Sequence, residues 1–114
     1  MADGETRLEG LAKRKILITG GAGMIGSTIA RLAAAAGARV TVLDTMAPQY
    51  GGNLFNLAGV DAKLVYGDIR EMALVSELVK GHEIIFNLAA QVSYVDSNID
   101  PFFDLDVNCR GHLT

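Results

Sequence analysis

A glycine-rich stretch near the start of the chain, with an acid roughly twenty residues beyond it, is the pattern best suited to chemistry. Residues 16–26 read Ile-Leu-Ile-Thr-Gly-Gly-Ala-Gly-Met-Ile-Gly, and Asp44 ends the next apolar run. A buried strand, a glycine turn and a helix start direct unpaired backbone N–H groups at phosphates, and the glycines allow close approach. Asp44 can accept hydrogen bonds from both hydroxyls of an adenosine ribose. The pattern therefore predicts a dinucleotide site, and a ligand-free turn is the competing interpretation.

The charge of Asp44 also bears on which dinucleotide would bind. A carboxylate at this place repels a ribose 2′-phosphate, and residues 45–47 (Thr-Met-Ala) bring no cation to neutralise one. The sequence therefore favours NAD over NADP as cofactor. The competing interpretation of Asp44 is a solvated carboxylate in a turn.

Short apolar segments alternate with helical patterns along the chain. Four of the segments are rich in β-branched or aromatic residues and apolar on both faces, which is typical of parallel strands covered by helices on each side. Helical patterns cover residues 24–36 and 71–80, and each ends at a glycine. Asp100 and Pro101 suit the N-cap and first position of a last helix. The predicted strands are Ile16–Thr19, Val40–Asp44, Lys63–Tyr66 and Glu83–Leu88.

This order of elements predicts an α/β fold with a Rossmann-type doubly wound parallel sheet, of which the chain supplies the N-terminal half. Right-handed crossovers then give the strand order 3-2-1-4. The ligand crevice lies at the carboxyl ends of strands 1 and 4, where the winding reverses. Four segments that follow strands are expected to meet there: Thr19-Gly20, Asp44, Asp68 and Ala89-Ala90.

Two regions of the chain bear on the domain boundaries. Residues 1–12 carry mixed charge without an apolar core, so we expect a flexible N-terminal extension followed by the N-terminal part of a dinucleotide-binding domain over residues 13–114. The apolar face of the last helix still runs at Thr114, which indicates truncation within a helix. Residues 83–88 would then form an apolar edge strand. We therefore expect the chain to dimerise through this side, to aggregate, or to be ordered only as part of a longer protein, and a homodimer is the predicted assembly.

Composition excludes several classes of protein. The chain has 114 residues, half of them apolar, a net charge of −3 and no dense Lys/Arg cluster, which argues against nucleic acid or an anionic membrane surface as partner. No apolar run is long enough to span a bilayer. The lone Cys109 fits a reducing, cytoplasmic compartment, and His82 and His112 lie too far apart in sequence for metal-ligand spacing.

Four motifs resemble those of the extended short-chain dehydrogenase/reductase family, specifically its NAD-dependent sugar-nucleotide epimerases and dehydratases. Residues 19–26 match the TGxxGxxG turn, and residues 67–70 (Gly-Asp-Ile-Arg) look like the GDxR element after strand 3. Residues 87–90 (Asn-Leu-Ala-Ala) are similar to the HxAA element after strand 4, and residues 108–111 match the NxxG of the next helix. The resemblance extends over residues 15–114, nearly the entire chain.

The resemblance implies roles for individual residues. The Asp68 side chain and the Ile69 backbone would contact adenine, and residues 88–90 would lie along the pyrophosphate and nicotinamide ribose. Asn53 belongs to a segment similar to the adenosine-side loop of nucleoside-diphosphoglucose 4,6-dehydratases. The competing interpretation of Asp68 is an N-cap for the helix at 71–80. Polar residues after strand 4, such as Gln91, suit either a ligand contact or an ordinary loop. The predicted cofactor-binding residues are Gly20, Gly23, Met24, Ile25, Gly26, Asp44, Asn53, Asp68, Ile69, Leu88, Ala89, Ala90 and Gln91.

The catalytic part of the family pattern has no match in this chain. The resemblance implies a Tyr-x-x-x-Lys base, yet none of Tyr50, Tyr66 and Tyr94 has a lysine four residues later. Asn87 stands in place of the usual His, and His112 in place of a common Thr. We therefore expect the NAD-binding portion of an enzyme acting on a nucleotide sugar, inactive by itself. The alternative is a non-catalytic dinucleotide-binding or sensing module.

Overall fold

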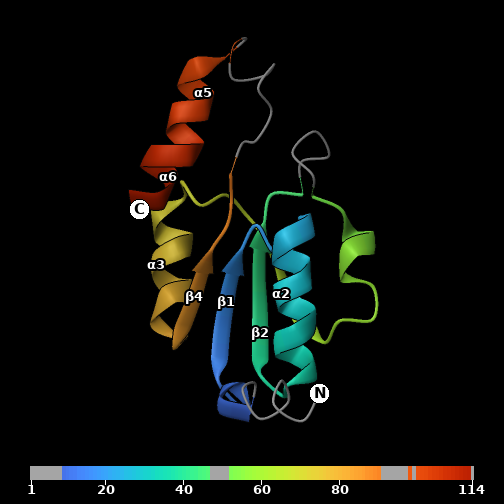
Figure 1. Ribbon diagram of the computed structural model, residues 1–114. Helices are drawn as coiled ribbons and strands as arrows, with labels where there is room; N and C mark the ends of the chain where they lie inside the picture. Colours follow the sequence, from blue (N-terminus) through green and yellow to red (C-terminus); the bar gives the residue numbers. More distant parts are fainter. Residues whose placement is uncertain (1–8, 47–51, 91–97, 99, 114) are drawn as a thin grey trace.

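The computed structural model describes residues 9–46, 52–90, 98 and 100–113. Within them four parallel strands form one sheet in the order β3-β2-β1-β4, with helices on both faces (Figure 1). This confirms the predicted Rossmann-type fold and its strand order. Each strand lies within one residue of its predicted bounds. The strands are β1 (Lys15–Thr19), β2 (Arg39–Asp44), β3 (Ala62–Tyr66) and β4 (Ile84–Asn87).

The register of the sheet aligns the strand ends that matter for a ligand. Thr19 at the end of β1 pairs with Leu43 of β2 on one side and with Asn87 of β4 on the other. Asp44 at the end of β2 pairs with Tyr66 of β3. Because all four strands are parallel, their carboxyl ends form one edge of the sheet.

Two apolar clusters hold the helices against the sheet. Ile16 and Ile18 of β1 are fully buried and cluster with alanines of α2 (Met24–Ala35) on one face. Leu17 points to the opposite face, where it clusters with Leu43 and Ile69 beneath α3 (Met72–Lys80). The double-sided burial of β1 explains why its sequence is apolar without alternation. Each such side chain contributes about 1.5–3 kcal/mol to folding.

The last helical run begins as predicted but is not uniform. The Asp100 carboxylate accepts the Phe103 N–H at 3.0 Å, so it caps the helix start, and Pro101 follows at the first helical position. The middle turn widens to π-helical geometry, which the sequence pattern did not indicate. A Cβ on Gly111 would lie 2.7 Å from Ile69 Cδ1, so glycine lets the run pack closely there. The run comprises α5 (Pro101–Leu105), η4 (Asp106–Arg110) and α6 (Gly111–Leu113).

The start of the folded region differs from the expected boundary at residue 13. Residues 9–11 form a 3-10 turn, η1 (Glu9–Leu11), and Leu11 packs against the cluster beneath α2. The Lys13 N–H also donates to the Gly37 carbonyl at 2.9 Å. The predicted extension over residues 1–12 thus includes a turn whose Leu11 packs against the core, and residues 1–8 lie outside the described part. Gly37 has a φ of +88°, the left-handed helix end expected of it.

Candidate functional site

Backbone hydrogen bonds join the four predicted segments at the carboxyl edge of the sheet. Gly20 N–H donates to the Leu43 carbonyl at 2.8 Å, and Leu88 N–H donates to the Thr19 carbonyl at 3.1 Å. Gly67 N–H, just before Asp68, donates to the Asp44 carbonyl at 3.0 Å. Residues from distant parts of the sequence are thus brought to one edge, as the topology predicted.

The glycines of the turn after β1 serve different purposes. Gly20 has a φ of +71°, and a Cβ on it would lie 2.8 Å from the backbone of Ala89. A Cβ on Gly26 would collide with the Gly20 carbonyl oxygen. Gly23 differs, because its φ of −76° and ψ of 177° suit any residue and a Cβ there would meet only the Gly20 oxygen at 3.4 Å. The fold requires glycine at positions 20 and 26, but it leaves open space at Gly23.

The open space at Gly23 lies at the N-terminus of α2. Gly23 is the N-cap of this helix and has no side chain to accept the N–H groups of the first turn. No acidic residue occupies that first turn. Met24 and Ile25 are 81% and 69% exposed, so the helix start faces outward. The positive end of the helix dipole is therefore accessible to an anion.

Asp44 is connected directly to the glycine turn. Its Oδ2 accepts the Ala22 N–H at 3.0 Å and its Oδ1 accepts the Met46 N–H at 2.8 Å. Each carboxylate oxygen has two lone pairs, so each retains capacity for one more donor. Asp44 therefore has the capacity to accept two hydroxyls while its orientation is fixed by the backbone.

The loop at Asn53 supports the turn in a way the sequence did not reveal. Asn53 Oδ1 accepts the Phe55 N–H at 2.9 Å and caps η3 (Leu54–Leu57), so this oxygen serves the local turn. The Asn53 N–H and Asn56 Nδ2 both donate to the Ala22 carbonyl, at 3.2 and 2.9 Å. Asn56 was not among the predicted residues, and its only signal was a second Asn three positions after Asn53. Together with Asp44, this loop holds both polar groups of the buried Ala22.

The buried Thr19, at the end of β1, organises the backbone that follows β4. Thr19 Oγ1 accepts the N–H groups of Leu88 and Ala89, at 3.0 and 3.2 Å, and its hydroxyl donates to Asn87 Oδ1 at 2.8 Å. Asn87 thus hydrogen-bonds within the sheet edge. The His112 Nε2 lies 2.6 Å from the Ala89 carbonyl oxygen, so α6 is tied to the same segment. Ala90 follows at the edge, exposed, and the predicted Gln91 lies outside the described residues.

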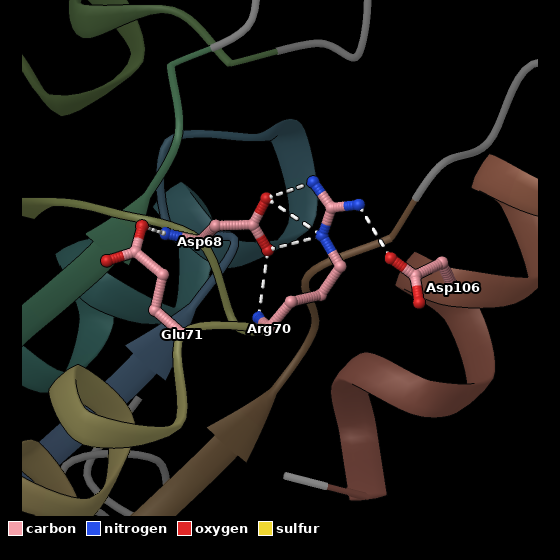
Figure 2. Close-up of polar contacts among 4 residues, drawn as sticks. All are labelled: Asp68, Arg70, Glu71 and Asp106. Carbon is pink, nitrogen blue, oxygen red and sulfur yellow. Dashed lines mark hydrogen bonds and ion pairs between the residues drawn. The ribbon is translucent and has the colours of Figure 1, made fainter.

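Asp68 faces an arginine rather than a helix start (Figure 2). Its carboxylate accepts three N–H groups of Arg70, and Arg70 Nη1 also donates to Asp106 Oδ2 at 2.7 Å. The N-cap of α3 is Glu71, so the competing interpretation of Asp68 as the N-cap of this helix is wrong. The hydrogen bonds from Arg70 hold the pKa of Asp68 below its usual value, against the opposing effect of burial. Those to Asp68 and then Asp106 raise the pKa of Arg70.

The side chain of Ile69 is not available to a ligand. It is 6% exposed and packs with Leu17 and Leu43 beneath the last helical run. Only its backbone is left for an outside contact, which agrees with the kind of contact implied for it. The described residues contain no group of His, Cys, Asp and Glu side chains able to hold a metal ion. Within the same part of the chain, no helix combines the length and apolar character needed to cross a membrane.

Comparison with known proteins places the chain in a family. The model of the NAD dependent epimerase/dehydratase family matches residues 16–114. The chain belongs to this family. A dTDP-glucose 4,6-dehydratase from Streptomyces niveus is 41% identical over 95 residues, covering 75% of this chain and 27% of that protein. The chain therefore spans less than a third of this relative.

Solved structures of longer proteins share the fold. Epimerase Mth375 from Methanothermobacter thermautotrophicus superposes with a TM-score of 0.88 at 29% identity, covering 96% of this chain and 32% of that one. DesIV, a dTDP-glucose 4,6-dehydratase from Streptomyces venezuelae solved with NAD bound, gives a TM-score of 0.75 at 34% identity, covering 85% and 33%. Dehydratases and epimerases thus both appear among the matches.

Proposed function

We propose that this chain binds NAD at the carboxyl edge of its sheet, as the cofactor-binding portion of a nucleoside-diphosphate-sugar epimerase or dehydratase. The observation that carries the proposal is the space at Gly23. The fold tolerates a side chain there, yet the residue is glycine and lies at the open N-terminus of α2. A close approach of pyrophosphate to the backbone accounts for that choice.

The second support is the placement of Asp44 beside this turn. Its carboxylate retains one acceptor position on each oxygen after binding the Ala22 and Met46 N–H groups. The two hydroxyls of an adenosine ribose fit this capacity. A 2′-phosphate would meet the same negative charge, so NAD is the preferred form.

The chain's contribution to a reaction is binding and orientation. NAD, when bound, supplies a hydride acceptor for a carbon of the sugar. The glycine turn and the first turn of α2 would hold the pyrophosphate, and Asp44 would hold the adenosine ribose. Thr19 fixes the backbone of residues 88 and 89, along which the nicotinamide side would lie. The Tyr-x-x-x-Lys base implied by the family resemblance would come from residues outside these 114, and so would the contacts that choose the sugar.

An assay of the protein encoded by the whole reading frame tests this function. It is incubated with NAD and a panel of nucleoside-diphosphate sugars, and the sugars are analysed by chromatography and NMR. We expect at least one sugar to be epimerised or dehydrated without net accumulation of NADH. Net NADH release from a small alcohol would instead indicate an ordinary dehydrogenase. Cofactor binding without any turnover would favour the sensing module.

A further inference from the structure

We propose that Arg70 is a positioning residue for adenine recognition. It holds the Asp68 carboxylate as the acceptor for the adenine amine, and Asp106 of the last helical run holds Arg70 in turn. The proposal rests on the proposed function and on the contact between Asp68 and adenine that the family resemblance implies. The Arg70 side chain would not contact the ligand itself. It would connect the cofactor site to the last helical run through Asp106.

The contacts between Arg70 and Asp68 fix the carboxylate from two directions (Figure 2). Arg70 donates its backbone N–H to Asp68 Oδ1 at 2.9 Å and its Nε–H to the same oxygen at 3.0 Å. Its Nη2 donates to Oδ2 at 2.6 Å. The Nε–H also reaches Oδ2, at 3.1 Å, so this one proton is shared between both carboxylate oxygens. A carboxylate has about four lone-pair sites, and the three donated protons leave room for about one more donor. One amine N–H of adenine fills that capacity.

The backbone of Asp68 is held separately from its side chain. Glu71 Oε1 accepts the Asp68 N–H at 3.1 Å, and the Asp68 carbonyl accepts the Glu71 N–H at 3.0 Å. The backbone would therefore stay in place if the guanidinium were removed. Loss of the guanidinium would remove the Nε and Nη2 contacts and leave the carboxylate held by the Arg70 backbone N–H alone, so its orientation would be less restricted while the backbone stays in place.

The last helical run holds the other side of the guanidinium. Arg70 Nη1 donates to Asp106 Oδ2 at 2.7 Å, and the guanidinium carbon lies 5.1 Å from the centre of the Phe103 ring. The Asp68, Arg70 and Asp106 side chains are only 22%, 32% and 28% exposed, so solvent screens these charges less than it would on an open surface. The planar guanidinium of Arg70 donates hydrogen bonds to two carboxylates at once, a geometry that the ammonium group of lysine lacks.

Ionisation of Asp68 matters for the choice of base. The arginine lowers the pKa of Asp68, which keeps the group charged and able only to accept. Adenine presents an amine donor, whereas hypoxanthine presents a carbonyl oxygen at the same place. A fixed carboxylate therefore favours NAD over nicotinamide hypoxanthine dinucleotide, and a mobile one discriminates less.

The test measures the affinity of the purified protein for both dinucleotides by calorimetry. We expect wild type to prefer NAD by about tenfold or more, the contribution of one hydrogen bond to a charged group. Arg70→Gln and Asp106→Asn should each reduce this ratio, mainly by weakening NAD, with the larger effect for Arg70→Gln. Lys80→Gln, which removes an exposed cation paired with Glu77 on α3, is the matched control and should leave the ratio unchanged.

The outcomes separate this proposal from the proposed function. Equal loss of both dinucleotides in folded Arg70→Gln would mean a purely structural arginine and would overturn the proposal. If Arg70→Gln does not unfold cooperatively, Arg70→Lys decides, because it keeps the charge, loses the fork and should still lower the ratio. A wild-type ratio of one would overturn the proposal while leaving dinucleotide binding intact. Binding of neither dinucleotide by wild type would overturn the proposed function as well.

Discussion

Substitution of Gly23 by alanine should separate cofactor binding from folding. A Cβ at this position meets one atom, the Gly20 oxygen at 3.4 Å, and the φ of −76° suits alanine. Alanine is worse than glycine as an N-cap by about 1 kcal/mol. Reduced entropy of the unfolded chain offsets about 0.4–1 kcal/mol of this. The free energy of unfolding should therefore change by less than about 1 kcal/mol, which shifts the unfolding midpoint by roughly 4 °C at most.

Binding should respond much more strongly than stability to Gly23→Ala. The methyl group would occupy the open space through which the pyrophosphate approaches the helix start. Loss of one hydrogen bond to a charged phosphate costs about 1.5–3 kcal/mol, so the NAD affinity should fall at least about tenfold. Calorimetry with NAD and thermal unfolding by circular dichroism measure the two effects on one sample.

Gly26→Ala provides the contrasting variant. A Cβ there would lie 2.7 Å from the Gly21 Cα and collide with the Gly20 oxygen, so we expect destabilisation by about 1–3 kcal/mol. Wild-type NAD affinity in Gly23→Ala would show that the ligand lies elsewhere. Unchanged stability in Gly26→Ala would refute the division of the glycines into structural and binding roles.

Three further predictions follow from individual contacts. Thr19→Val removes the acceptor of two backbone N–H groups at a site 4% exposed, so the free energy of unfolding should fall by about 1–3 kcal/mol. Thr19→Ser keeps the hydroxyl and should retain most of the wild-type stability. Equal stability of the two variants in chemical denaturation would contradict this. The pKa of Asp68 is lowered from 3.8 in the folded state, so the ionised carboxylate contributes to the free energy of unfolding above pH 3.8. This contribution is lost as the pH falls through the folded pKa. Denaturation curves across acidic pH should therefore show a steeper loss of stability in wild type than in Arg70→Gln, and identical slopes would refute it. Ile85 on β4 is 43% exposed at an edge of the described sheet, so the chain should self-associate in sedimentation and Ile85→Lys should reduce this; a monodisperse wild-type monomer would count against it.

The backbone path was predictable because it follows from periodic burial and chain connectivity. Strand ends, the left-handed Gly37 and the Asp100 cap were each encoded within a few neighbouring residues. The crossover rule then placed Asp44, Asp68 and Ala89 at one edge without any contact information.

The partners of individual side chains were less predictable, because they depend on which donor the fold brings nearest. Asp68 had the spacing of an N-cap, yet Arg70 takes its carboxylate, and Arg70 is held in place by Asp106, 36 positions further along the chain. Asn53 remains a predicted ligand contact, and its spacing did not indicate that its Oδ1 accepts the Phe55 N–H within its own loop. Such choices follow from packing between distant segments, which local spacing does not encode.

Competitive titration of the purified protein with NAD and NADP tests the central claim most directly. The claim is that the glycine turn at the start of α2 and the carboxylate of Asp44 together form a site for NAD. Calorimetry should show binding of NAD and weaker binding of NADP, because the extra 2′-phosphate meets the charge of Asp44. Equal or tighter binding of NADP would contradict the role of Asp44, and no binding of either would contradict the site itself.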